Sequence, residues 1–103
     1  MLSNKEKFIF TSELALAISN GLQIEEGLKM LVGFDAGVSR CAKKLMDIMQ
    51  DGTSFVDALK QSNDFDEYMI QMVVVGQSIG NLDVVLKELS VYYERQKKLN
   101  YQI

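Results

Sequence analysis

The sequence predicts an all-α domain, and three observations carry this prediction. The chain has 103 residues and no proline, a residue that ends helices and is frequent in the loops of β-rich folds. Ala, Leu, Lys, Glu and Met, which favour helices, are common. Apolar residues recur at helical spacing between glycines that mark turns. We therefore expect one compact bundle of about six helices over residues 1–103, of the up-and-down type with short glycine turns.

The first half of the chain predicts three helices. Ser3 and Glu6 have the spacing of a capping box at the start of the first helix, and Gly21 is placed to end that helix in the left-handed conformation. Asp35 is placed to cap the third helix. The expected ranges are residues 4–20, 24–34 and 36–50.

The second half predicts three more helices. Gly52 marks a turn before a short helix that Ser54 caps and that runs to about residue 61. Asp64 with Glu67 predicts the start of the fifth helix, and Gly80 breaks the chain before a last helix over residues 82–100. The expected inner faces are Tyr68, Met69, Met72, Val73 and Gly76 in the fifth helix, and Leu82, Val85, Leu86, Leu89 and Tyr93 in the last.

The charge of the chain is acidic and uneven. Asp and Glu number 14 against 11 Lys and Arg, which argues against nucleic-acid binding because that function needs a basic face. Residues 1–93 hold 13 acids and 8 bases, whereas residues 94–103 hold one acid and three bases. We therefore expect a basic tip, formed by Arg95, Lys97 and Lys98, on an acidic body.

Catalytic chemistry has few candidates in this sequence. Histidine is absent, which removes Ser-His-Asp and Cys-His nucleophile systems and histidine metal sites. Cys41 is the only cysteine, so no internal disulfide can form. Its neighbours Arg40 and Lys43 could lower its pKa, but a small half-buried helix residue is the favoured interpretation.

The clustered carboxylates are better explained by helix structure than by catalysis. Acidic residues at predicted helix starts favour the helix dipole. A small enzyme that uses Glu25, Glu26 or Asp66 alone is an alternative, and it requires these side chains to converge in one pocket. We predict no enzyme activity, no cofactor and no metal.

One outward face of the last helix predicts a partner surface. Val84 and Val91 are seven residues apart and lie opposite the core stripe, while Tyr92 lies at the edge of that stripe. Two exposed β-branched residues on one face suggest an interaction site, whereas single exposed valines are also normal on a solvated helix.

Three stretches, in order over about residues 8–95, resemble one protein family. The stretches are Phe10-x3-Leu14-Ala15-x5-Gly21-Leu22-x4-Gly27-Leu28, Ile48-x3-Gly52-x-Ser54-Phe55-x2-Ala58-Leu59 and Gly76-Gln77-Ser78-x-Gly80-x-Leu82-x3-Leu86-x5-Tyr92-x-Glu94. The family that they resemble is the F domain of type II secretion and type IV pilus inner-membrane core (platform) proteins, and the chain looks most like the first cytoplasmic domain of the toxin-coregulated pilus (type IVb) version.

The resemblance implies a six-helix cytoplasmic domain of a polytopic bacterial inner-membrane protein, with a membrane helix soon after residue 103. It implies a non-catalytic role: docking the assembly ATPase and other platform proteins, so that ATP-driven motion reaches the pilin subunits. It also implies a homodimer in some relatives. The signature residues expected to shape the fold are Gly21, Gly52, Gly76, Gly80, Leu82, Leu86, Tyr92 and Glu94.

One position departs from the family pattern. Gln77 stands where the closing signature usually has glutamate. Some relatives bind a metal at their dimer interface through acidic side chains, so the missing charge supports the prediction of no metal. The rival interpretation of the whole chain is a free-standing helical adaptor or a helix-turn-helix-like regulator, built around Gly52 or Gly80.

Overall fold

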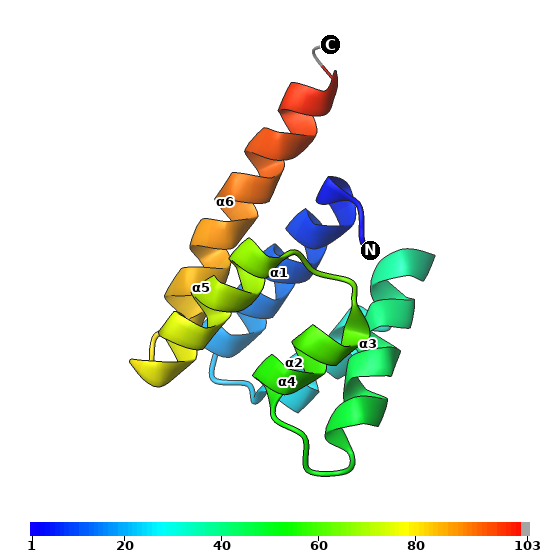
Figure 1. Cartoon of the computed structure of the whole chain (residues 1–103), viewed down its shortest axis with the longest axis vertical. Coiled ribbons are helices and arrows are strands. Elements are labelled where there is room, and N and C mark those ends of the chain that lie inside the picture. The colour runs from blue at the N-terminus through cyan, green and yellow to red at the C-terminus, as the bar shows by residue number, and fades with distance from the viewer. Residues whose placement is uncertain (102–103) are drawn as a thin grey trace.

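A computed structural model describes residues 1–101 of the chain, with side chains through residue 99 (Figure 1). Within these residues it contains six α-helices and no strand, which confirms the predicted all-α bundle. The helices are α1 (Asn4–Ser19), α2 (Ile24–Leu31), α3 (Ala36–Met49), α4 (Phe55–Ser62), α5 (Glu67–Ser78) and α6 (Leu82–Tyr101).

Most of the predicted helix starts are confirmed by their caps. The Glu6 amide donates to Ser3 Oγ at 3.1 Å, and the Ser3 amide donates to Glu6 Oε1 at 2.9 Å, so the predicted capping box is present. Asp35 and Ser54 each accept a backbone amide hydrogen at 3.1 Å at the starts of α3 and α4. These side chains satisfy donors that would otherwise lack a partner in the first turn.

The start of α5 was predicted incorrectly. Asp66, not Asp64, caps this helix, since Asp66 Oδ1 accepts from the Met69 amide at 2.9 Å. Asp64 instead binds Lys44 Nζ of α3 at 2.9 Å. Both aspartates lie close enough to the start of α5 to be its cap by sequence alone. The ion pair between Asp64 and Lys44, which are distant in sequence, leaves Asp66 as the cap. Tyr68, expected on the inner face, is 48% exposed, and its ring lies beside that of Tyr92 at the surface.

The predicted end of α2 was also wrong. The helix ends at Leu31. Residues 32–34 form a turn in which each backbone amide donates a hydrogen bond to the carbonyl three residues before it. The ends of α1, α3, α4 and α6 differ from the prediction by one residue each, which is the usual uncertainty at a frayed terminus.

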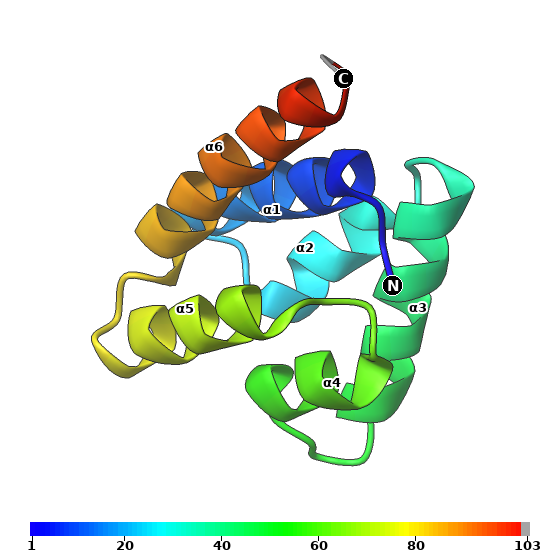
Figure 2. The same cartoon turned by 45° about the horizontal axis from the view of Figure 1, so that its top comes forward.

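The first and the last helix, α1 and α6, pack side by side. Figures 1 and 2 show α6 running antiparallel to α1, with α5 against α6 and with α2, α3 and α4 on the other side of α1. Figure 2 shows α3 steeply inclined to α1 and α5. The body measures 43 × 29 × 25 Å, and the last turns of α6 project beyond the other helices in Figure 1.

The glycines of the family signature have the predicted local roles. Gly21, Gly52 and Gly80 adopt positive φ angles of 90°, 89° and 74° at turns, a conformation that other residues rarely adopt. Gly76 lies where α5 meets α6, and a Cβ there would come within 2.7 Å of Val85 Cγ2. The absence of a side chain at Gly76 therefore permits the close approach of these two helices.

One continuous core joins all six helices. The predicted inner face of α6 is buried throughout, including Leu82, Leu86 and Tyr93. Within residues 1–101, none of the helices combines the length and the apolar character needed to cross a membrane.

Candidate interaction surface

An open groove lies between α1 and α6 on the surface of the bundle. Its volume is about 450 Å³. Because the two helices are antiparallel neighbours, the end of α1 faces the beginning of α6 along this groove. The residues that line it are Ser12, Ala15, Leu16 and Ser19 of α1, and Asp83, Val84, Lys87 and Glu88 of α6.

Small side chains on α1 explain why the groove is hollow. Ala15 and the two serines leave space that larger residues would fill. The Ser12 hydroxyl donates to the Phe8 carbonyl at 2.7 Å, and the Ser19 hydroxyl donates to the Leu16 carbonyl at 2.9 Å. Because both hydroxyls bond to carbonyls of their own helix, they add little polarity to the lining of the groove.

Two exposed apolar side chains form the walls of the groove. Leu16 is 58% exposed and Val84 is 48% exposed, and Val91, 46% exposed, lies two turns further along α6. The predicted exposure of Val84 and Val91 is confirmed. The sequence did not single out Leu16, because apolar residues on several faces of the first helix are also typical of a helix that is enclosed on several sides. The signal was present, since Leu16 is flanked by small and polar residues on its own face.

Charges surround this apolar strip. Asp83, Lys87 and Glu88 line the same groove. Among the side chains that the structure describes, these three have no oppositely charged nitrogen or oxygen within 4.0 Å. The groove thus combines exposed apolar walls with charged groups that are free to pair with a partner.

A different polar site lies at the other end of the α1–α6 pair. Lys7 of α1 is buried, and its Nζ donates to Asp66 Oδ2 at 2.9 Å. The hydroxyl of Tyr93 donates to the same oxygen at 2.7 Å, and the Lys7 ammonium lies 5.4 Å from the centre of the Tyr93 ring. We call Lys7, Asp66 and Tyr93 the Asp66 cluster. It joins α1, the cap of α5 and α6.

The hydrogen bonds of this cluster perturb two pKa values. Burial raises the pKa of Asp66, but hydrogen bonds from Tyr93, the Met69 amide and Lys7 outweigh it and hold the pKa below its ordinary value. Burial, reinforced by the Asp66 carboxylate, raises the pKa of Tyr93 well above its ordinary value. Asp66 is thus ionised, Tyr93 is neutral, and the carboxylate serves as a structural acceptor.

The other candidate reactive groups also have structural roles. Glu26 accepts a hydrogen bond from the Gln23 amide at 2.9 Å at the start of α2, and Glu25 is exposed in the same turn. Neither lines the groove, and Asp66 is engaged in its own cluster. Burial, followed by the nearby Asp64 carboxylate, raises the pKa of Cys41 to about 12, which agrees with the favoured interpretation of a structural helix residue and disfavours activation by Arg40 and Lys43.

Comparison with known families decides the family of this chain. A family model described as type II secretion system (T2SS), protein F, matches residues 10–103. The chain belongs to this family. Two relatives each carry the description type IV pilus assembly protein PilC.

The relatives are much longer than this protein F family domain. The Myxococcus xanthus relative is 28% identical over 105 residues, covering 99% of this chain and 25% of the relative. The Thermus thermophilus relative is 25% identical over 101 residues, covering 96% of this chain and 25% of the relative. The chain therefore spans about a quarter of the length of the curated relatives it matches.

The closing signature of the protein F family domain lies on the α5–α6 hairpin. Tyr92 is partly exposed, with its ring centre 4.9 Å from that of Tyr68 and 5.2 Å from that of Tyr93. Glu94 pairs with Lys98 at 3.7 Å on the surface. Gln77 is exposed at the end of α5. Among the side chains of residues 1–99, no three acidic or cysteine groups gather as a metal site would require.

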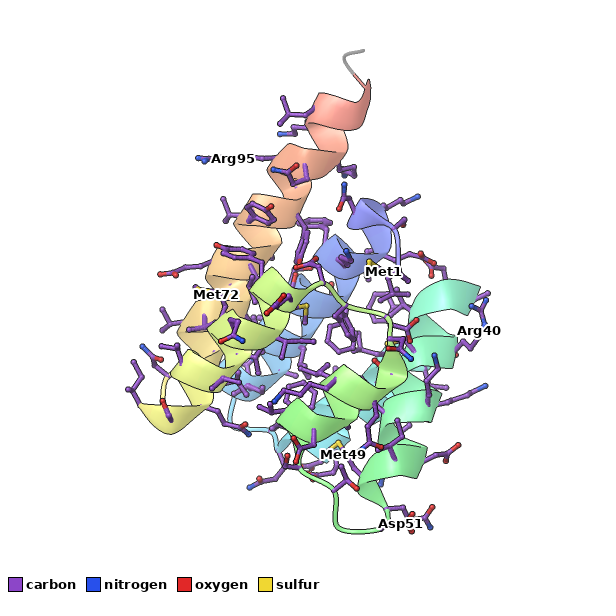
Figure 3. The ribbon with its side chains drawn as sticks, in the orientation of Figure 1. Met1, Arg40, Met49, Asp51, Met72 and Arg95 are labelled. Carbon is purple, nitrogen blue, oxygen red and sulfur yellow. The ribbon has the colours of Figure 1, made fainter. Side chains whose placement is uncertain are left out.

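The basic tip lies on the projecting end of α6. Figure 3 shows Arg95 pointing away from the bundle. Lys97 Nζ lies 5.0 Å from the centre of the Phe8 ring of α1, and Lys98 is the partner of Glu94. The charges of the tip are therefore distributed around the helix and do not form one face.

Proposed function

We propose that this protein F family domain is a non-catalytic docking module on the cytoplasmic face of the bacterial inner membrane. It serves the platform of a type IV pilus or type II secretion machine. It binds the assembly ATPase and other platform proteins, so that ATP-driven motion reaches the pilin subunits. The parent protein is polytopic, and a membrane helix follows residue 103.

Family membership is the observation that carries this proposal. The match covers residues 10–103, and both relatives are named as pilus assembly proteins. The groove supports a binding role, because its two exposed apolar walls and its charged rim are features of protein interaction sites. Its two serine hydroxyls bond to backbone carbonyls and not to a general base, which disfavours nucleophilic chemistry there.

The regulator alternative has less support. The turns at Gly52 and Gly80 connect helices, but helix–turn–helix connectivity is common in all-α proteins. The chain carries a net charge of −3, which opposes binding to nucleic acid. We therefore retain the docking function alone.

Co-purification from the native host tests this function. The parent protein is tagged, Val84→Glu is introduced, and the assembly ATPase retained at physiological salt is measured. We expect wild type to retain the ATPase and Val84→Glu to retain it at least about tenfold less. The matched control is Met30→Glu, because Met30 is 56% exposed on α2 and lies outside the groove.

Two results would contradict the proposal. One is that the wild-type parent protein retains no ATPase even with its membrane segments present. The other is that Val84→Glu and Met30→Glu retain equal amounts.

A further inference from the structure

The shape of the groove limits what can occupy it. It runs between two antiparallel helices (Figure 1), and on the α1 side its lining includes the small residues Ser12, Ala15 and Ser19. Side chains of a third helix pack well into such a furrow, because ridges on one helix fit between the ridges of its neighbours. Leu16 and Val84 then contact the apolar side of that helix from either wall.

The charge of the groove limits the occupant further. Its rim has two carboxylates, Asp83 and Glu88, and one ammonium group, Lys87. None of them forms an ion pair within the described part of the chain. Residues 1–93 as a whole carry 13 acids against 8 bases. A partner surface that approaches this face meets an excess of negative charge, so a basic partner is favoured and an acidic one is repelled.

From shape and charge together, we infer that the α1–α6 groove binds a basic amphipathic helix of a partner protein. An apolar side chain of this helix fits between Leu16 and Val84. Lysine or arginine residues one turn away pair with Asp83 and Glu88. This inference rests on the proposed docking function and names the kind of segment that docks.

A nuclear magnetic resonance titration of this chain tests the inference. The probe is an alanine-based helical peptide of about 16 residues, with leucines one turn apart and lysines on the flanks. Backbone amide shifts of the isotope-labelled domain are followed up to about 1 mM peptide, a range that detects weak helix–groove binding. We expect saturable shifts in Ser12, Leu16, Ser19, Val84 and Lys87.

Matched peptides and variants separate the two contributions. A peptide with glutamate in place of every lysine should bind at least about tenfold more weakly, since like charges then meet at the rim. A peptide with serine in place of leucine should also bind at least about tenfold more weakly. Val84→Ser in the domain should have the same effect, whereas Ile79→Ser, at an exposed position directly after α5 and outside the groove, should not.

Several outcomes would overturn the inference. The lysine peptide could cause no shifts at 1 mM, could shift α5 residues instead, or could bind no better than the glutamate peptide. Concentration-dependent shifts in the groove without peptide would identify a second copy of the chain as the occupant. Groove shifts caused only by vesicles containing phosphatidylglycerol would identify a lipid surface.

The inference and the proposed function fail separately. If Val84→Glu abolishes ATPase retention but the lysine peptide does not bind, the docking function stands and the basic helix is wrong. If the peptide binds but Val84→Glu leaves ATPase retention unchanged, the groove binds a basic helix for another purpose.

Discussion

Charged side chains are paired at one end of the α1–α6 pair and unpaired, among the described side chains, at the other. At one end, the Asp66 carboxylate accepts hydrogen bonds from Lys7, Tyr93 and the Met69 amide. At the other end, Asp83, Lys87 and Glu88 line an apolar groove with no ion pair among the described side chains. The difference indicates that the Asp66 cluster holds the helices together, whereas the groove is available to a partner. Substitutions should therefore affect stability at the first site and binding at the second.

The largest loss of stability is expected in the apolar layer on which both sites rest. Leu86 is fully buried, so Leu86→Ala should lower the free energy of unfolding by about 2–5 kcal/mol through lost contacts and a cavity. Urea unfolding followed by circular dichroism measures the change, with the neighbouring Lys87→Ala as the control. A loss under about 0.5 kcal/mol would show that α6 does not pack as described.

The Asp66 cluster should come next. Asp66→Ala removes the cap of α5 and leaves the Lys7 ammonium buried without its acceptor, so we expect a loss of about 2–4 kcal/mol. Glu67→Ala, an exposed position in the same turn, is the matched control. Equal unfolding curves for the two variants would mean that the cluster contributes nothing to stability.

Lowering the pH should also reveal the contribution of Asp66 to the free energy of unfolding. Because hydrogen bonds hold the pKa of Asp66 below its ordinary value, the stabilisation is complete above the unfolded pKa of about 3.9 and is lost as pH falls through the lower folded pKa. Urea unfolding at neutral pH and at about pH 3 should therefore show a smaller decrease for Asp66→Asn than for wild type. An identical pH dependence in both proteins would rule out this role of Asp66.

Cys41 offers a chemical test of the same core. Burial raises its pKa to about 12, so the native thiol should react very slowly with a disulfide reagent at pH near 8 and rapidly in urea. The rate is followed by absorbance. A native rate equal to that in urea would support activation by Arg40 and Lys43 instead.

The smallest effect on stability is expected in the groove. Leu16→Ser and Val84→Ser remove exposed side chains, so each should change the free energy of unfolding by less than about 0.5 kcal/mol. Urea unfolding with the same protocol provides the comparison. A loss above about 1 kcal/mol would mean that these residues support the fold and that the groove is not a free surface.

Local rules were sufficient to predict most of the fold. The caps at Ser3, Asp35 and Ser54 and the turn glycines depend on contacts within a few residues, and these are visible in the sequence. The buried face of α6 follows from helical periodicity alone. Such features need no knowledge of the neighbouring helices.

Tertiary contacts explain what the sequence did not reveal. Asp66 and not Asp64 caps α5 because Lys44 binds Asp64 while Lys7 and Tyr93 gather around Asp66, and these partners are distant in sequence. The groove was half predicted: Val84 was expected outside, but its opposite wall, Leu16, depends on how α1 and α6 pack. The sequence of one helix does not reveal which part of its surface the neighbouring helix will leave uncovered.

The most direct test of the groove as the working surface is pilus or secretion assembly by the parent protein carrying Leu16→Ser together with Val84→Ser. The amount of parent protein in the membrane is measured in the same cells. We predict normal protein amounts with assembly reduced at least about tenfold. Normal assembly at a normal protein amount would contradict the role given to the groove.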